Sequence, residues 1–408
     1  MSPEKEMHQY TPGERKNGLR ILLVYTFFMV TGFTMLMPMV AVHYVNDLGM
    51  AATLVGIALA TRQMTQQGLA IGGGVLADLY GTKRMIGLGV TVRAVGFAGL
   101  AFADSVFPLF IALIVSAIGG ALFEAPYQAA MAALTTSSDR TRYYSLSNWV
   151  SGVASTVGPL LGAVLVSFDF MMVCLVSSAL FFLCLVVITR LPTIHNGSQS
   201  AQVANNIRLV GRDRRFTSLI LLMAGYWVVA VQMGIIIPLQ AGLSSGSKSG
   251  AGIALALSAA ITIALQYHLT SRLSRSFSNH TILTAGIVVL SAGMGAIALF
   301  GSFSGLLFCV AIISTGAVLV RPTYQAIVAD TANPKALGTY LGVSSLSLGF
   351  GGAIGHIAGG ALFDLSVKVQ APQLPWVTFA IIGLTTATAL HYWVRRTGIA
   401  ATAFSDCK

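Results

Sequence analysis

Residues 107–134 read FPLFIALIVSAIGGALFEAPYQAAMAAL, a long apolar run with one charged side chain, Glu124. A helix needs about 20 consecutive apolar residues to cross a bilayer, so this run predicts a transmembrane helix. The acids nearest to Glu124 along the chain, Asp104 and Asp139, flank the run on its two sides. We therefore expect Glu124 at membrane depth, where a charge is costly and usually serves a function.

Apolar runs of this kind fill most of the chain. Of its 408 residues, 55% are hydrophobic and 9% are charged, whereas soluble domains carry about 25% charged residues. Twelve hydrophobic segments follow from the pattern: 19–45, 52–77, 85–103, 107–134, 143–167, 170–190, 216–241, 250–270, 280–301, 304–329, 336–363 and 374–394. The predicted fold class is an all-α integral membrane protein with twelve transmembrane helices.

The lysines and arginines predict the orientation of these helices. Nineteen of the 24 lie in the termini and in alternate loops, and only Lys248 and Lys368 lie in the opposite loops. The remaining three, Arg62, Arg93 and Arg321, lie within predicted helices. Basic residues gather on the cytoplasmic side, so we expect cytoplasmic termini in a bacterial inner membrane. The net charge of +11 is then a topology signal, and we expect no nucleic-acid partner.

The sequence shows no pattern for a metal, a cofactor or an enzyme active site. Its four cysteines have neither paired nor metal-like spacing, and it contains no phosphate loop or nucleophile elbow. We expect a monomeric, non-enzymatic protein without a cofactor, whose partners are the lipid bilayer, a small-molecule substrate and protons.

A polar stretch between the sixth and seventh segments divides the membrane part into two halves. The predicted domains are a cytoplasmic tail over 1–18, a six-helix bundle over 19–190, a cytoplasmic linker over 191–215, a second six-helix bundle over 216–394 and a cytoplasmic tail over 395–408.

A shift of 197 residues aligns one region of the first half with the second half without a gap. Gly119 then falls on Gly316, and the pair Tyr127-Gln128 falls on Tyr324-Gln325. Parallel six-helix repeats, related by an axis along the membrane normal, are how one large class of secondary transporters is built. We therefore expect two pseudo-symmetric bundles with a substrate site between them, near the bilayer midplane.

The connection between the second and third segments reads GVLADLYGTKR, residues 74–84. It resembles the G-x-L-a-D-r-x-G-r-r signature of the major facilitator superfamily, with Leu79 in place of the usual basic residue. Glycines permit a tight turn, and a carboxylate and cations near helix ends can pair with each other and with helix dipoles. We expect a conformational latch here, formed by Gly74, Asp78, Gly81, Lys83 and Arg84. The alternative is that Lys83 and Arg84 only fix the topology.

The fifth segment contains GVASTVGPLLG, residues 152–162, which resembles the G-P-x-x-G core of a motif of the antiporter branch of that superfamily. A proline kinks the helix, and glycines allow close packing against a neighbour. The motif residues are Gly152, Gly158, Pro159 and Gly162. The resemblance favours export over uptake.

Over its whole length the chain resembles the drug:proton antiporters of the superfamily. The resemblance is closest at VGIAL (55–59), RQ (62–63), QQGL (66–69), VRAVGFA (92–98) and LPW (374–376). It implies efflux of small molecules against proton entry. One departure is that Ser116-Ala117-Ile118 precede Gly119-Gly120, where many members carry an arginine. The proton-transfer role proposed for that arginine therefore cannot be assigned to this chain.

The charges inside the predicted helices are the candidates for proton coupling. Arg321 is the repeat equivalent of Glu124, and Arg62 lies at a similar depth in the second segment. A buried carboxyl group can be poised to exchange a proton, so we assign coupling to Glu124, Arg321 and Arg62. The alternative is a Glu–Arg pair that only stabilises a closed state. Arg93, nine residues from Arg84, is expected to reach the cytoplasmic interface and to be structural.

Polar residues near these charges are the candidates for binding substrate. Those at i+3 and i+4 from Glu124 and Arg321 share a helix face with them, and glutamines accompany Arg62. The predicted substrate-binding set is Arg62, Gln63, Gln66, Glu124, Tyr127, Gln128, Arg321, Tyr324, Gln325 and His356. For His356, a satisfied core histidine is the alternative.

The predicted function is a proton-coupled exporter of small organic molecules that works by alternating access. Because the intramembrane charges are mainly arginines, the first alternative is export of an anionic metabolite such as a carboxylate siderophore. Uptake by symport is the next alternative, and a channel or a membrane enzyme is the last.

Overall fold

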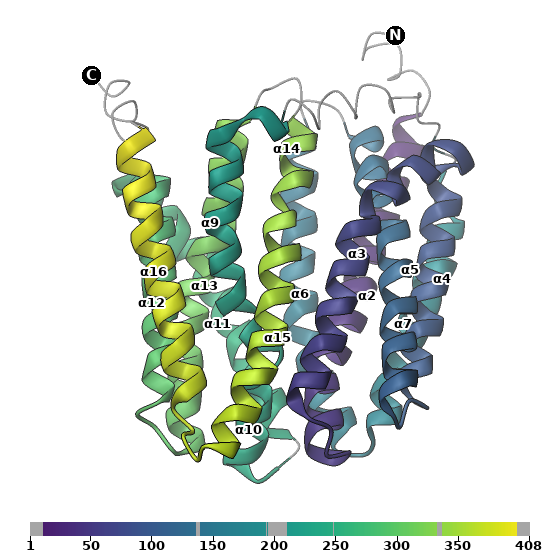
Figure 1. The fold of residues 1–408 in the computed structure, drawn as a ribbon. Coiled ribbons are helices and arrows are strands. Elements are labelled where there is room, and N and C mark those ends of the chain that lie inside the picture. The colour runs from purple at the N-terminus through teal and green to yellow at the C-terminus, as the bar shows by residue number, and fades with distance from the viewer. Residues whose placement is uncertain are drawn as a thin grey trace. The chain divides into compact units, whose positions relative to one another are not determined.

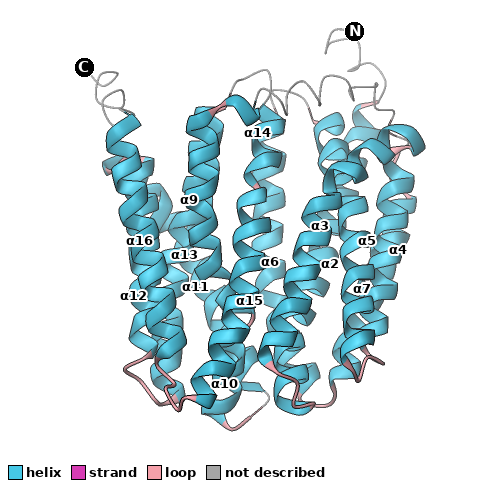
Figure 2. Cartoon of the chain, viewed as in Figure 1, coloured by secondary structure: helices cyan, strands magenta, loops and turns pink. Residues whose placement is uncertain are grey.

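The computed structural model describes residues 11–135, 139–192, 194, 210–247, 249–332 and 337–397. These residues form helices joined by short loops, and none of them forms a strand (Figures 1 and 2). The predicted all-α class is confirmed.

The chain divides into two compact units, each described by itself. Unit 1 comprises Met1–Met39 and Thr61–Ser200, and unit 2 comprises Val40–Ala60 and Ala201–Lys408. The helices of the first half are α2 (Pro12–Val42), η1 (His43–Asp47), α3 (Ala52–Tyr80), α4 (Thr82–Leu100), α5 (Val106–Leu134), α6 (Arg140–Val166) and α7 (Phe170–Thr189). Both α2 and α3 contribute residues to the two units.

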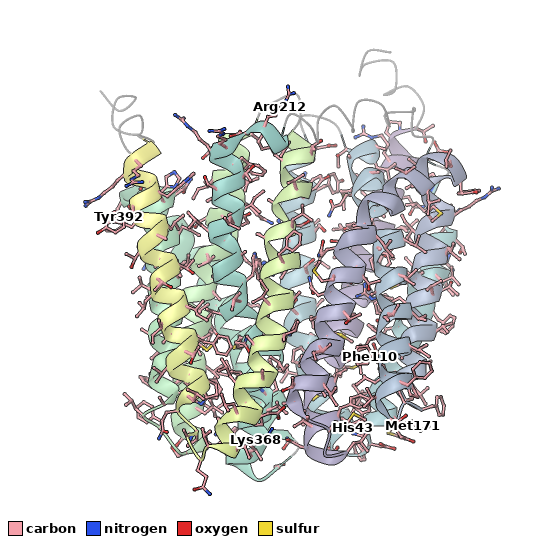
Figure 3. All side chains as sticks on the ribbon, in the orientation of Figure 1. His43, Phe110, Met171, Arg212, Lys368 and Tyr392 are labelled. Atoms are coloured by element: carbon pink, nitrogen blue, oxygen red, sulfur yellow. The ribbon has the colours of Figure 1, made fainter. Side chains whose placement is uncertain are left out.

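The second half repeats this order. Its helices are α9 (Arg214–Ala230), η2 (Val231–Gly234), α10 (Ile236–Ser245), α11 (Ser249–Ser276), α12 (Asn279–Ile297), α13 (Phe303–Thr331), α14 (Leu337–Ser344), α15 (Leu346–Lys368) and α16 (Leu374–Thr397). Arg212 and Lys368 lie at opposite ends of unit 2 in Figure 3, as residues of alternate loops in a helical bundle must.

Nine of the helical stretches in the described residues are long and apolar enough to cross a membrane. With α3, α4 and α11 they make the twelve predicted spans, so the fold class is confirmed. The polarity of α4 comes from Lys83, Arg84 and Arg93, and that of α3 from Arg62 and its glutamines. Of these helices, α3 and α4 contribute to the candidate site, together with the apolar helix α5.

Glycine contacts fix α4 against α5 in unit 1. A Cβ atom on Gly119 would collide with the backbone nitrogen of Arg93 and would lie 2.6 Å from the carbonyl oxygen of Gly89. A Cβ atom on Gly96 would lie 2.8 Å from the Cα atom of Ser116. The two backbones therefore touch, and this contact places Arg93 on the buried side of α4.

The same device recurs in unit 2 between α12 and α13. A Cβ atom on Gly316 would lie 2.6 Å from the carbonyl oxygen of Gly286 and 2.9 Å from the Cα atom of Leu290. These three residues follow Gly119, Gly89 and Arg93 by the same spacing of 197 residues. The sequence repeat is thus also a packing repeat, except that Leu290 replaces Arg93.

Candidate functional site

A polar network lies inside unit 1, where α3, α4 and α5 meet. On α3, Arg62 Nη2 donates to Gln63 Oε1 at 3.0 Å, and Arg62 Nη1 donates to Gln66 Oε1 at 3.1 Å. From α4, Arg93 Nη2 donates to the same Gln66 oxygen at 3.3 Å. The other end of this amide, Gln66 Nε2, donates to Glu124 Oε2 on α5 at 3.1 Å. Gln66 therefore links two guanidinium groups to one carboxylate.

Local helix geometry explains why Arg62 and Gln66 act together. Residues four apart in an α-helix lie on one face, so both side chains of α3 point the same way. Gly73, further along α3, permits close contact with α5, because a Cβ atom there would collide with the carbonyl oxygen of Ala121. A Cβ atom on Gly120 would lie 2.8 Å from the Gln66 side chain, so the absence of a side chain at Gly120 leaves room for Gln66 beside α5.

Four aromatic rings surround the Arg93 guanidinium. Its Cζ atom lies 4.8 Å from the ring centroid of Phe33, and 5.3, 5.5 and 5.6 Å from those of Phe123, Phe97 and Phe181. Only 3% of Arg93 is exposed, so the expectation that it reaches the cytoplasmic interface is wrong. The ring faces attract the cation and exclude water from it.

The network contains more positive than negative charge. Arg62 and Arg93 are both buried, and Glu124 is half-buried. The Nε atoms of both arginines are buried without a hydrogen-bond partner among the described residues. Buried charges are costly unless paired and hydrogen-bonded. Polar and charged side chains at membrane depth are usually functional, so this network is the candidate functional site.

Tyr127, predicted to line a substrate site, is buried in helix contacts. Its hydroxyl group lies 2.6 Å from Thr26 Oγ1 and 3.0 Å from Ser147 Oγ, and its ring stacks on Tyr25. It thus joins α5 to α2 and α6. The neighbouring Gln128 is exposed.

The predicted site residues of unit 2 have different surroundings. Tyr324 is buried, and its hydroxyl group lies 3.3 Å from the Ser347 hydroxyl and donates to the Ser344 carbonyl. Arg321 and Gln325 are exposed on α13, and His356 is buried on α15. Glu124 belongs to unit 1 and Arg321 to unit 2, so a shared role for the two stays a prediction.

The predicted latch segment forms the end of α3 and the start of α4. Gly81 between them has a φ angle of +92°, which glycine adopts readily and other residues rarely adopt. Lys83 Nζ donates to the carbonyl oxygen of Thr189 at the end of α7, at 2.6 Å, and Arg84 is exposed. Gly74 makes only an ordinary contact with Ala125. The Asp78 side chain lies outside the described atoms, and the latch stays a prediction.

The second motif packs α6 against α2 within unit 1. A Cβ atom on Gly158 would collide with Thr34 Oγ1, and one on Gly162 would lie 2.6 Å from the Met35 carbonyl oxygen. Pro159 lies inside α6. A Cβ atom on Gly152 would meet nothing within 4 Å, so close packing explains two of the three glycines.

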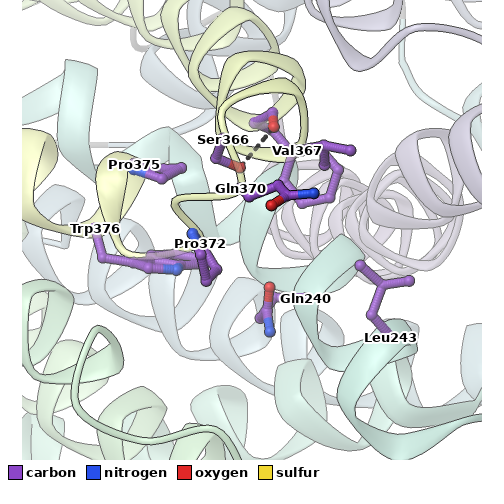
Figure 4. A pocket seen from close by; sticks show the side chains of 9 residues that line it. Gln240, Leu243, Ser366, Val367, Gln370, Pro372, Pro375 and Trp376 are labelled. Atoms are coloured by element: carbon purple, nitrogen blue, oxygen red, sulfur yellow. Dashed lines mark hydrogen bonds between the residues drawn. The ribbon is translucent and has the colours of Figure 1, made fainter.

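Unit 2 also has a pocket of about 400 Å³ at the ends of α10, α15 and α16 (Figure 4). Trp376 and two prolines form one side of it, and the amides of Gln240 and Gln370 supply polar groups. None of its lining residues is titratable. It is not part of the charged network of unit 1.

Comparisons with known proteins agree with this architecture. The chain matches the Major Facilitator Superfamily over residues 22–356 and again over residues 222–405. It is 34% identical to the Multidrug resistance protein MdtH of Escherichia coli O157:H7 over 379 residues, which cover 93% of this chain and 94% of the relative. The identity to MdtH of Salmonella typhimurium strain LT2 is 35% over the same shares.

Solved transporter structures share the fold at low sequence identity. The POT family transporter PepTSo has a TM-score of 0.79 at 13% identity, over 96% of this chain and 99% of that chain. The nucleoside transporter NupG has a TM-score of 0.77 at 13% identity, over 92% and 98%. Likenesses this remote concern the fold alone.

Proposed function

Because the chain belongs to the major facilitator superfamily, we propose that this membrane transporter is a proton-driven exporter of small organic molecules. It works by alternating access in the bacterial inner membrane, with both termini cytoplasmic. The multidrug-resistance relatives support drug-like substrates. Inward proton flow drives outward substrate flow.

The observation that carries the proposal is the contact between Glu124 and Gln66. The ionised carboxylate accepts the Gln66 amide hydrogen and offsets part of the charge of Arg62 and Arg93. Protonation of Glu124 removes this negative charge and weakens its bond to Gln66. The protonation state of one residue thus changes the charge and the hydrogen bonding of three neighbours.

Competition at Glu124 would give antiport. A neutral or cationic substrate that donates a hydrogen bond or a charge binds best to the ionised carboxylate, so proton binding opposes substrate binding. In this scheme Arg62 and Gln63 orient the network. On the second half, Arg321 supplies the repeat-related charge, and Gln128 and Gln325 contribute exposed amides. Tyr127, Tyr324 and His356 complete the predicted substrate-binding set.

The unpartnered Nε atoms of Arg62 and Arg93 favour a second candidate, export of an anionic metabolite. A carboxylate of the substrate could accept hydrogen bonds from these Nε–H groups and also pair with the positive charge of the guanidinium. An anion would bind most strongly to the protonated form of Glu124, because the network is then more positive. Substrate and proton would bind cooperatively at this site, the opposite of the competition expected for a cation.

Everted membrane vesicles test proton coupling directly. We expect Glu124→Gln to abolish export driven by a pH gradient while leaving expression and energy-independent substrate exchange intact. Asp104→Asn is the matched control, because Asp104 is an exposed acid outside the helices and its neutralisation should leave transport unchanged. Normal gradient dependence in Glu124→Gln would remove this residue from the mechanism.

The same vesicles distinguish the substrate classes. Ethidium, a fluoroquinolone and a citrate-type siderophore are compared at equal concentrations in vesicles with and without the protein. Preference for ethidium or the fluoroquinolone supports the first candidate. Preference for the siderophore, with tighter binding at lower pH, would establish the second in its place.

A further inference from the structure

The first N–H groups of α3 receive a cap from a distant helix. Helix N-termini leave backbone N–H groups without intrahelical acceptors, and the nearest preceding residues, Gly49, Met50 and Ala51, have no side chain that could accept them. The Asp364 carboxylate on α15 accepts Ala52 N–H at 3.0 Å and Thr53 N–H at 2.8 Å. The same group also accepts the Thr53 hydroxyl at 2.6 Å. All three residues belong to unit 2.

Glycines bring the two helices together beside this cap. A Cβ atom on Gly360 would collide with the Ala52 carbonyl oxygen, and one on Gly56 would collide with the His356 carbonyl oxygen. His356, Gly360 and Asp364 are spaced four residues apart and lie on one face of α15. We call this contact the α3–α15 seam: Ala52, Thr53 and Gly56 on one side, and His356, Gly360 and Asp364 on the other.

The seam is built so that it can separate. The closest approaches in the seam are between glycines and backbone carbonyl oxygens, where small residues let the two helices meet. The Asp364 side chain is only partly buried, so water can replace its three bonds as the contact opens.

The seam matters because α3 runs through both units. Its residues up to Ala60 belong to unit 2, and from Thr61 onward the helix belongs to unit 1, where Arg62 and Gln66 join the polar network. One continuous helix is thus attached at both ends. A movement of one unit against the other must therefore either bend α3 or release one attachment. The attachment to unit 1 includes the charged network, so the seam is the simpler one to open.

We propose that Asp364 is a releasable cap: it holds the start of α3 on α15 in the present state and lets go of Ala52 and Thr53 during each transport cycle. The proposal rests on the proposed alternating-access export for its place in the cycle. Its geometry rests on the three hydrogen bonds and the glycine contacts alone. Asp364 is therefore a positioning residue for the conformational change and not a group that binds substrate.

A disulfide across the seam tests whether the cap must open. Thr53→Cys and Asp364→Cys are combined in a Cys407→Ser background, and the two single-cysteine proteins are the controls. Oxidation should join the two cysteines and reduce ethidium export at least tenfold, and a reductant should restore export. The two single-cysteine controls should export ethidium equally well before and after oxidation. Equal export by the oxidised and reduced pair would overturn the proposal. Failure of the bond to form under any condition would contradict the seam itself.

A second measurement does not depend on transport of any one substrate. The Thr53→Cys variant keeps Asp364 and both hydrogen bonds from the backbone. Its cysteine is labelled with a membrane-impermeant maleimide in permeabilised vesicles, where the reagent reaches both faces of the membrane. We expect slow labelling at rest that becomes at least threefold faster in Asp364→Ala. Labelling that is absent in both proteins would refute cap opening. If labelling behaves as expected and ethidium is not exported, the failure lies with the proposed function instead.

Discussion

Gln66 and Glu124 are joined by a hydrogen bond whose direction is fixed by the neighbours of the amide. The Gln66 oxygen accepts from Arg62 and Arg93, so its nitrogen must face the carboxylate, which it does at 3.1 Å. An ionised carboxylate can only accept, and this arrangement supplies it with a donor. The amide therefore connects the Glu124 carboxylate to both arginines.

Replacing the amide should break this coupling. Gln66→Leu leaves two buried guanidiniums without their shared acceptor, and we expect a loss of about 1–3 kcal/mol of stability together with loss of gradient-driven export. Thermal unfolding in detergent and vesicle transport measure the two effects. Gln128→Leu, at an exposed glutamine of α5, is the control for stability and should change it by less than about 0.5 kcal/mol. Equal stability of the two variants would show that the bridge does not stabilise the fold.

Arg93 can be replaced by the residue that its repeat equivalent carries. Leu290 is buried at the corresponding position of α12, between glycine contacts of the same geometry. We therefore expect Arg93→Leu to fold and reach the membrane but to lose at least tenfold in gradient-driven export, because the network is left without one of its two cations. Arg212→Leu, at an exposed site outside every predicted functional set, controls for the loss of a basic residue. Full activity of Arg93→Leu would make Arg93 a packing residue only.

The membrane spans were predictable from sequence, because roughly 20 apolar residues in a row permit few structures other than a helix across a bilayer. The network was predictable in part. Spacing places Arg62 and Gln66 on one face of α3, and the sequence predicted both of them, with Glu124, as site residues.

Arg93 was missed because its distance from Arg84 along the chain suggested that it reaches an interface. Its direction depends on how Gly89, Gly96 and Gly119 rotate α4 against α5, and no local pattern encodes that rotation. One signal could have found it, since the 197-residue repeat aligns Arg93 with Leu290, an apolar core position. Asp364 was missed for a similar reason. Its partners lie more than 300 residues away along the chain. From its local sequence, Asp364 is only an acid near a helix end.

The bond from Lys83 to the Thr189 carbonyl gives a way to test the latch. A cation at the end of α7 interacts favourably with the helix dipole, but exposed contacts of this kind contribute little. We expect Lys83→Gln to leave thermal stability within about 0.5 kcal/mol of wild type. If the residue also serves as a latch, export should fall clearly despite unchanged stability. Unchanged export would leave Lys83 with a role in topology and helix capping only.

Two of the three glycines of the α6 motif, Gly158 and Gly152, should respond in opposite ways to substitution by alanine. A methyl group at Gly158 collides with Thr34 Oγ1 and lies 2.9 Å from the Thr31 carbonyl oxygen, and α2 cannot yield without disturbing its own hydrogen bonds. We expect Gly158→Ala to lower the free energy of unfolding by about 1–3 kcal/mol. A methyl group at Gly152 meets nothing within 4 Å, so Gly152→Ala should raise stability by about 0.5–1 kcal/mol, the advantage of alanine over glycine in a helix.

Thermal unfolding of both variants in the same detergent checks this contrast, and export shows what else each glycine does. A loss of export in Gly152→Ala, despite higher stability, would mean that this helix needs backbone freedom at Gly152 while the transporter changes state. Equal destabilisation by both substitutions would contradict the packing of α6 on α2 described above.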